Sequence, residues 1–276
     1  MTAIATTTGW QSHLRVTLPR VIKSEWIKFW SLRSTWITLV AAVVAFVGIG
    51  MLATSLGADG TATPPGQGGP GPGGGQAMDP TSLSLAGTTF AQLILATLGV
   101  LLTATEYSTG MIRATLTAVP KRLAVLWAKL TVFVSVVLSI SLIASFVTFL
   151  GGQAVLESGV SLSDSGVLRA VVGTAVYLTG AGVIGLVLGV LLRATAAAVT
   201  TVFGMLFILP GVSGLLMPDS WSDAVSPYLP SNAGSAFTAV TQTADHLNPW
   251  AGLAVFAGYL VIAVIGAAVR LKTRDA

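Results

Sequence analysis

The sequence predicts an all-α integral membrane protein with six transmembrane helices. Hydrophobic residues make up 53% of its 276 residues and charged residues only 9%, whereas a typical soluble domain is about 25% charged. The apolar residues gather in long runs, and the segments between these runs alternate between basic and acidic. Because no water inside a membrane can hydrogen-bond the backbone, apolar runs of about 20 residues must form helices.

The distribution of charge predicts the orientation in the membrane. If the chain crosses six times, thirteen of its fourteen Lys and Arg residues share one side, and the other side holds seven Asp and Glu residues with Arg169. Cytoplasmic loops carry the excess of Lys and Arg, so we expect a plasma-membrane protein with both termini in the cytoplasm. The net charge of +4 flanks apolar runs without interleaved aromatic residues. This arrangement favours an anionic lipid surface over nucleic acid as a partner.

Six spans follow a cytoplasmic N-terminal segment, residues 1–34. They are predicted at about 35–57, 83–104, 123–150, 167–192, 195–217 and 249–269, which gives a transmembrane domain over residues 35–269 and a cytoplasmic tail over residues 270–276. The first span is too long for a cleaved secretory peptide and is interpreted as a retained signal anchor. Only Arg193 and Ala194 separate the fourth and fifth spans, so a count that fuses or breaks them differently remains open.

Residues 14–33 predict an amphipathic helix before the first span. Apolar side chains recur on one side of this helix, and Arg, Lys and Ser side chains on the other. Trp26 and Trp30 border the apolar stripe, as aromatic residues do at membrane interfaces. Such a helix is expected to lie in the inner membrane surface. A simple basic anchor would use the same residues, but it would not require Glu25 near the apolar side.

The two long outer loops differ in composition. Residues 57–82 contain the run TPPGQGGPGPGGGQ, which has no apolar periodicity and predicts a flexible tether. Residues 218–248 carry Trp221, Tyr228 and Phe237 among several prolines. This aromatic and turn-rich composition predicts a loop that folds against the membrane surface.

The loop between the second and third spans predicts a short two-faced helix within residues 106–120. Its apolar side chains recur at helical spacing from Met111 to Val119, whereas Arg113 points away from them and Pro120 ends the turn. One face could rest on the bundle and the other on a soluble partner. By amphipathicity alone, a plain connector is equally well supported.

The residue inventory argues against an enzyme. The chain has no Cys, and both histidines, His13 and His246, lie outside the predicted spans, so no metal site can be assembled from His and Cys. Residues 211–214, Gly-Val-Ser-Gly, resemble the serine motif of rhomboid proteases, but no predicted span contains the histidine that this motif needs. We interpret these glycines as helix-packing residues.

The spans also lack the groups that power an ion-driven carrier. Their middles contain no ionisable residue of the kind that binds a coupling ion. Lys129 and Arg169 lie near span edges, from which both side chains are expected to snorkel to the headgroups. No G-x-x-x-x-G-K-[ST] phosphate loop occurs in the chain. If the protein is a pump, a separate ATPase subunit is the natural source of energy.

Two motifs resemble one family of transporters. The run E-W-x-K-x-x-S-x-R-S-T-W at Glu25–Trp36 and the segment E-Y-x-x-G-x-I-R…P-x-R at Glu106–Arg122 combine with six spans. Together they resemble the permease subunit of type-2 ATP-binding-cassette (ABC) exporters, as in the G subfamily. The resemblance covers nearly the whole chain in segment order. The Gly/Pro-rich first outer loop departs from the short connection that is usual in the family.

This resemblance implies roles for both cytoplasmic helices. Residues 14–33 would be the connecting helix, with Glu25, Trp26 and Lys28 as its marked residues. Residues 106–120 would contain the coupling helix, which would dock on the ATPase through Glu106, Gly110, Met111, Ile112, Arg113 and Leu116. Two permeases, identical or paralogous, would assemble with two ATPase subunits. ATP and Mg²⁺ would be bound by those partners, and no cofactor by this chain.

The resemblance also implies a path for cargo. The second and fifth spans would line it from Thr88 to Thr103 and from Thr201 to Leu216, beneath re-entrant helices of the last outer loop. An apolar wall favours an amphipathic or hydrophobic compound, such as a drug, peptide or lipid, moved outward by alternating access. The candidate cargo contacts are Gln92, Phe203, Met205 and Phe207. Phe and Met side chains at helical spacing are, however, more often packing residues. Gly185-x-x-x-Gly189 is likewise interpreted first as a helix-packing motif.

Two other functions remain open beside this transport subunit. A membrane receptor or scaffold would need the same cytoplasmic helices but no path between the spans. An ion channel would normally show polar or charged pore rings, which these spans lack. The direction of transport rests on the resemblance alone.

Overall fold

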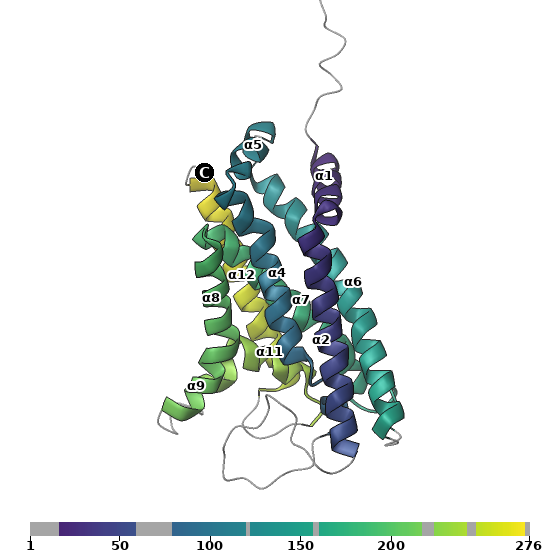
Figure 1. The fold of residues 1–276 in the computed structure, drawn as a ribbon. Coiled ribbons are helices and arrows are strands. Elements are labelled where there is room, and N and C mark those ends of the chain that lie inside the picture. The colour runs from purple at the N-terminus through teal and green to yellow at the C-terminus, as the bar shows by residue number, and fades with distance from the viewer. Residues whose placement is uncertain are drawn as a thin grey trace, which may run out of the picture.

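The computed structural model describes residues 17–58, 79–119, 122–156, 160–216, 224–241 and 247–273. These residues form helices and their connections, and no strand occurs among them. Six helical segments are long and apolar enough to cross a membrane, and they run alongside one another in a bundle (Figure 1). The prediction of an all-α fold with six candidate spans is confirmed.

The spans correspond closely to the predicted ranges. They are α2, α4, α6, α7, the continuous segment that begins with α8, and α12. In chain order the helices are α1 (Leu18–Ser31), α2 (Arg33–Ala58), α3 (Pro80–Ser84), α4 (Thr88–Ser108), α5 (Met111–Ala118), α6 (Arg122–Leu156), α7 (Val167–Leu192), α8 (Thr195–Phe203), the π-helical η2 (Gly204–Ile208), α9 (Leu209–Leu216), the 3-10 turn η3 (Ser226–Tyr228), α11 (Pro230–Thr238) and α12 (Pro249–Thr273).

The second span begins at Thr88, later than the sequence indicated. The preceding residues form the separate helix α3, whose first turn is capped by the Asp79 carboxylate accepting a hydrogen bond from Ser82 N at 3.3 Å. Gly87 then lies against α2, where an added Cβ would come within 2.1 Å of the Phe46 carbonyl oxygen. Only a glycine permits this approach. The central part of the predicted tether, residues 59–78, lies outside the described residues.

A sharp turn separates the fourth and fifth spans. Arg193 has a φ of 57°, in the left-handed region that commonly ends a helix. The chain therefore leaves α7 at Arg193, and α8 packs against α4 and α7. Because α8 continues through η2 into α9, the fifth span is separate from the fourth.

Helix α7 lies at the centre of the bundle and packs closely against α4. An added Cβ at Gly185 would come within 1.9 Å of the Ala96 carbonyl oxygen, and one at Gly189 within 2.1 Å of Thr103 Oγ1. The Thr103 hydroxyl also donates a hydrogen bond across the interface to the Leu186 carbonyl oxygen at 2.9 Å. The predicted packing role of Gly185 and Gly189 is confirmed, since small residues allow the two backbones to touch.

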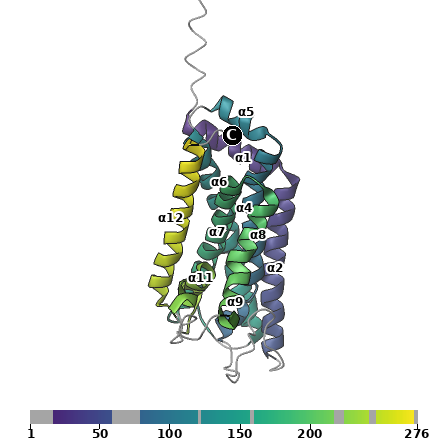
Figure 2. The ribbon, with the colours of Figure 1, turned by 90° about the vertical axis from the view of Figure 1, so that its left-hand side faces the viewer.

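The two ends of the bundle carry different elements. Helices α1 and α5 lie at one end together with the C-terminal end of α12, and α11 lies toward the other end, packed on α7 and α12 (Figures 1 and 2). Part of the predicted loop 218–248 therefore folds onto the spans, whereas residues 217–223, including Trp221, and residues 242–246 lie outside the described residues.

Arg169 makes contacts at the α11 end that the sequence did not predict. The last carbonyl groups of α11 lack helical partners, and they accept hydrogen bonds from its side chain. Arg169 Nη1 donates to the Phe237 carbonyl oxygen at 2.7 Å, and Nη2 donates to that of Ala239 at 2.8 Å. Arg169 thereby fastens α11 to α7.

We expect Gly185→Ala to lower the melting temperature of the protein in detergent. The new Cβ would overlap the Ala96 carbonyl oxygen and force α4 and α7 apart, at a cost of about 1–3 kcal/mol. Gly48→Ala in α2 is the matched control, because an added Cβ there meets no atom within 4 Å and Ala is the better helix former. Thermal unfolding followed by circular dichroism measures both variants. Equal melting temperatures would contradict the close approach.

Candidate functional site

Four charged side chains from three helices meet at the end of the bundle that carries α1 and α5. Lys129 Nζ of α6 lies 2.8 Å from Glu25 Oε2 of α1 and 2.6 Å from Glu106 Oε1 of α4. Lys28 of α1 contacts the same Glu106 oxygen. We call these four residues the charge cluster. It contains two basic and two acidic side chains, and it joins α1, α4 and α6.

The charge cluster is largely buried. The side chain of Glu106 is 2% exposed and those of Glu25 and Lys129 are each 9% exposed, whereas Lys28 reaches the surface with 25%. Ions removed from water need close partners, so the loss of one member leaves an uncompensated buried charge. Glu106 Oε2 has no hydrogen-bond partner among the described residues. The other carboxylate oxygen of Glu106 therefore makes both of its ion pairs.

Helix packing brings these charges inside. Glu25 lies one helical turn from both Val21 and Phe29, and these three residues form the buried side of α1. Helix α1 packs this side against α6, where Lys129 lies on the facing surface. Burial of the apolar side chains of α1 therefore carries Glu25 into the interior, and Lys129 supplies the opposite charge that a buried carboxylate requires.

The position of Lys129 corrects the expectation that this side chain snorkels to the headgroups. It turns into the bundle because two carboxylates, Glu25 and Glu106, replace the water that its ammonium group loses. Sequence reasoning marked both carboxylates but missed their common partner. The available signal was Glu25 on the apolar side of its helix, since a buried acid needs a cation and Lys129 is a basic residue within a predicted span.

Helix α5 begins next to the charge cluster. Gly110 has a φ of 71°, a left-handed conformation that lets the chain leave α4 and enter α5 directly. Ile112 is buried and lines, with Glu106 and Lys129, a cavity of about 20 Å³, which is space for about one water molecule. Met111 is exposed. One side of α5 thus faces the charge cluster and another is accessible.

Trp26 is the residue marked on α1 that does not join the charge cluster. Trp26 is exposed, and its ring packs edge-on against Trp30 with the ring centroids 5.6 Å apart. The side chains of Arg113 and Leu116 lie outside the described part of the structure. The structure therefore brings together Glu25, Lys28 and Glu106, and adds Lys129 to them.

The four predicted cargo contacts do not gather in one place. Gln92 is buried between α4 and α7, where its side-chain oxygen accepts a hydrogen bond from the Tyr177 hydroxyl. Phe203 and Phe207 are exposed on α8 and η2, and Met205 packs partly against the core that α4 and α7 share. None of these four side chains lines the cavity beside the charge cluster or the cavity between α2 and α6.

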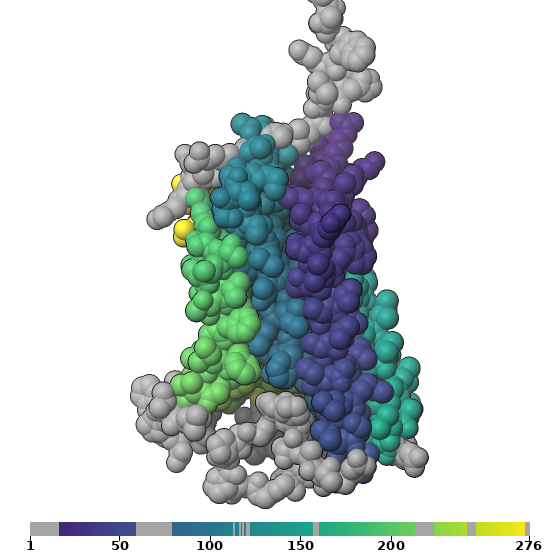
Figure 3. Space-filling view, in the orientation of Figure 1, coloured from purple at the N-terminus to yellow at the C-terminus, as the bar shows by residue number. Residues whose placement is uncertain are grey.

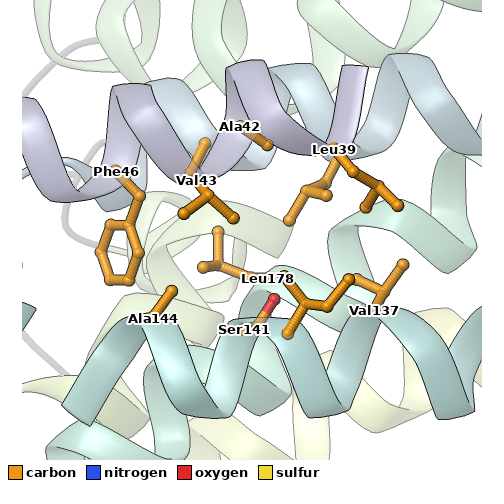
Figure 4. A pocket seen from close by; sticks show the side chains of 11 residues that line it. Leu39, Ala42, Val43, Phe46, Val137, Ser141, Ala144 and Leu178 are labelled. Atoms are coloured by element: carbon orange, nitrogen blue, oxygen red, sulfur yellow. The ribbon is translucent and has the colours of Figure 1, made fainter. Parts of the chain in front are cut away.

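The cavity between α2 and α6 is too small for cargo. It holds about 10 Å³, whereas a ligand pocket typically measures roughly 300–1,000 Å³. Figure 4 shows Phe46 and Val43 of α2 facing Val137 and Ala144 of α6 across it, with Leu178 of α7 behind. Its lining is apolar apart from the hydroxyl of Ser141. The cavity is a packing gap in the core.

The chain matches no protein-family model and no curated protein. Its class therefore follows from fold and composition: six helices long and apolar enough to cross a membrane indicate a multi-pass membrane protein.

We expect Lys129→Met to destabilise the protein by about 3–5 kcal/mol, because Glu25 would remain buried without a cation and Glu106 would lose one. The double variant Lys129→Met/Glu106→Gln removes one carboxylate with the ammonium group and should recover part of the loss. Lys23→Met, on the exposed side of α1, is the control. Thermal unfolding in detergent compares the three. A Lys129→Met protein as stable as the unmodified one would rule out a structural charge cluster.

Lys28 should titrate far below an ordinary lysine. Burial and the neighbouring Lys129 ammonium group, opposed by the Glu25 carboxylate, lower the pKa of Lys28 from 10.5 to about 8. Above this pH Lys28 loses its charge, so the tie between α1 and α4 should weaken as pH rises. Acylation reports the pKa, because only the free amine reacts. Pulse acetylation across a pH series, read by peptide mass spectrometry, should show half-maximal acetylation of Lys28 near pH 8. Exposed Lys23 is the internal reference. Identical dependence of acetylation on pH for Lys28 and Lys23 would refute the shift.

Proposed function

We propose that the chain is the transmembrane permease subunit of an ATP-driven ABC exporter. It moves an amphipathic or hydrophobic compound outward by alternating access, and separate ATPase subunits bind and hydrolyse ATP. The end of the bundle with α1 and α5 faces the cytoplasm, with α1 as connecting helix and α5 as coupling helix. The motifs at Glu25–Trp36 and Glu106–Arg122, together with six apolar helices, support this proposal.

The charge cluster is the observation that carries the proposal. An exporter powered by separate subunits has to transmit movement from surface helices to spanning helices. Glu25 and Lys28 tie α1 to α6 and α4, and Gly110 joins α5 directly to α4. A force on α5 therefore acts on α4, and through the charge cluster on α1 and α6. This is the connection that a coupling helix needs.

We place the proposed cargo path between two permease copies, because the core cavities within one chain are too small for cargo. Helices α2, α4 and α8 lie side by side on one face of the bundle (Figure 3). In the most apolar 18-residue stretch of the fifth span only 17% of the residues are buried, whereas 78% are buried in that of α7. Phe203 and Phe207 are exposed on this span. A second permease at the fifth span would enclose these side chains in a shared path.

The same small cavities favour a receptor or scaffold as the second candidate, since such a protein needs α1 and α5 but no path. The two functions separate in one experiment. The protein is purified gently from its native membrane, co-purifying chains are identified by mass spectrometry, and vanadate-sensitive ATP hydrolysis is assayed. A stoichiometric phosphate-loop ATPase with activity would support the exporter. A pure and inactive six-span protein from intact complexes would favour the receptor.

We expect Phe207→Glu to abolish export while leaving ATPase binding intact, because it places a charge in the proposed apolar path. Ile262→Glu is the matched control, since Ile262 is an exposed apolar residue of α12 outside that path. Cargo transport in vesicles and co-purification of the ATPase are measured for both. Export that survives Phe207→Glu would remove the fifth span from the path.

Gly110→Val should uncouple ATP hydrolysis from transport. A β-branched residue disfavours the left-handed backbone at position 110 by roughly 1–2 kcal/mol, so α5 would leave α4 in another direction. Gly110→Asn is the control, because Asn tolerates this conformation and an added Cβ meets no atom within 4 Å. The measured quantity is cargo transported per ATP hydrolysed. Equal ratios in both variants would contradict a role for this turn in coupling.

A further inference from the structure

A larger pocket opens where α7 and α12 begin, at the end of the bundle opposite α5. Its volume is about 390 Å³, within the range of small-molecule sites. The lining includes Ser165, Gly166, Arg169, Asn248 and Trp250. The charge cluster lies at the other end of the spans, so the proposed coupling function does not account for this pocket.

Arg169 supplies the positive charge of the pocket. Its bonds to the carbonyl oxygens of Phe237, at 2.7 Å, and Ala239, at 2.8 Å, hold the guanidinium group in place. A guanidinium group has five N–H donors, and these two bonds use two of them. The remaining donors are available to a ligand, and a fixed planar guanidinium matches the oxygen atoms of a phosphate.

Two helix N-termini add to this positive charge. Gly166 directly precedes the 26 residues of α7, and Asn248 directly precedes the 25 residues of α12. Their first N–H groups are not free, because Val167 N donates to the Asp164 carbonyl oxygen at 3.2 Å, Pro249 has no N–H and Trp250 N donates to Asn248 Oδ1 at 3.1 Å. The contribution of these helix ends is therefore their dipole. The aligned peptide dipoles of a helix place partial positive charge at its N-terminus, which attracts anions. The acidic neighbour Asp164 is not among the pocket-lining residues, and its carboxylate accepts a hydrogen bond from Ser161 N at 2.8 Å.

Trp250 indicates the depth of the pocket in the membrane. Its side chain is 67% exposed at the first turn of a spanning helix, and its ring centroid lies 5.7 Å from that of Phe237. Exposed Trp at the end of a span is typical of the layer between hydrocarbon and water. The headgroups of lipids, with their phosphates, occupy this layer.

We propose that this pocket binds a phosphate-bearing anion. Arg169 makes the charged contact, the N-terminal turns of α7 and α12 add positive potential, and Trp250 forms the apolar wall. The phosphate comes from a lipid headgroup or from free phosphate, and the two sources differ in whether an acyl chain accompanies the anion.

The test uses the full-length protein in detergent and two probes, phosphatidylglycerol and inorganic phosphate, with binding measured by native mass spectrometry. Ser165→Glu places a carboxylate at the exposed rim and leaves the bonds of Arg169 intact. We expect it to weaken binding by roughly tenfold, the equivalent of one charge-assisted hydrogen bond. Ser165→Gln controls for size, and Ser163→Glu places the same charge at an exposed residue that does not line the pocket; both should bind normally.

Each outcome decides the proposal. Weaker phosphatidylglycerol binding in Ser165→Glu alone, with no binding of inorganic phosphate, supports the site and identifies a lipid headgroup. Binding of inorganic phosphate with the same dependence on Ser165 supports the site with a soluble source. Equal affinities in Ser165→Glu and Ser165→Gln for both probes overturn it. Equal losses in Ser165→Glu and Ser163→Glu also overturn it, because they reveal a general effect of surface charge.

Discussion

The close approach of α4 and α7 is the constraint on which the rest of the bundle depends. At Gly185 the two backbones leave no room for a side chain, and the Thr103 hydroxyl crosses the interface to the Leu186 carbonyl oxygen. Glu106 lies one helical turn beyond Thr103, so the contact that fixes α4 against α7 also fixes the depth of Glu106. Other spans pack around this pair: α2 packs against α4, α6 packs against α7, and α8 packs against both α4 and α7.

The charge cluster extends this fixed pair to α1 and α6. Ion pairs are an expensive way to join helices, because a well-packed apolar group of similar volume is often as stable or more so. What they provide is selectivity of position: Lys129 satisfies Glu25 and Glu106 together only when α1, α4 and α6 are in one register. An apolar contact would tolerate sliding of α1 along α6. Under the proposed function, such sliding would dissipate the movement that α5 receives.

Hydropathy and glycine spacing predicted the spans and the packing of Gly185 because both depend on residues that are near one another in sequence. The later start of the second span was not predictable, since it follows from the contact between Gly87 and the Phe46 backbone. The charge cluster shows the same limit. Glu25 and Glu106 were identified from local motifs, but their shared partner Lys129 lies 104 residues from Glu25 and 23 from Glu106. Arg169 likewise donates to carbonyl groups that lie 68 and 70 residues away in the sequence.

The spans differ in how much of each is buried within one chain. Glycine contacts join α4 to α7, and the charge cluster ties α1 and α6 to α4. The fifth span and α12 are less enclosed than these helices, because only 17% of the most apolar 18-residue stretch of each is buried. The fifth span also contains the π-helical segment η2, and such segments interrupt the regular hydrogen-bond pattern of a helix. Under the proposed function, we therefore expect alternating access to move α1, α4, α6 and α7 together against the fifth span and α12, and not to separate α4 from α7.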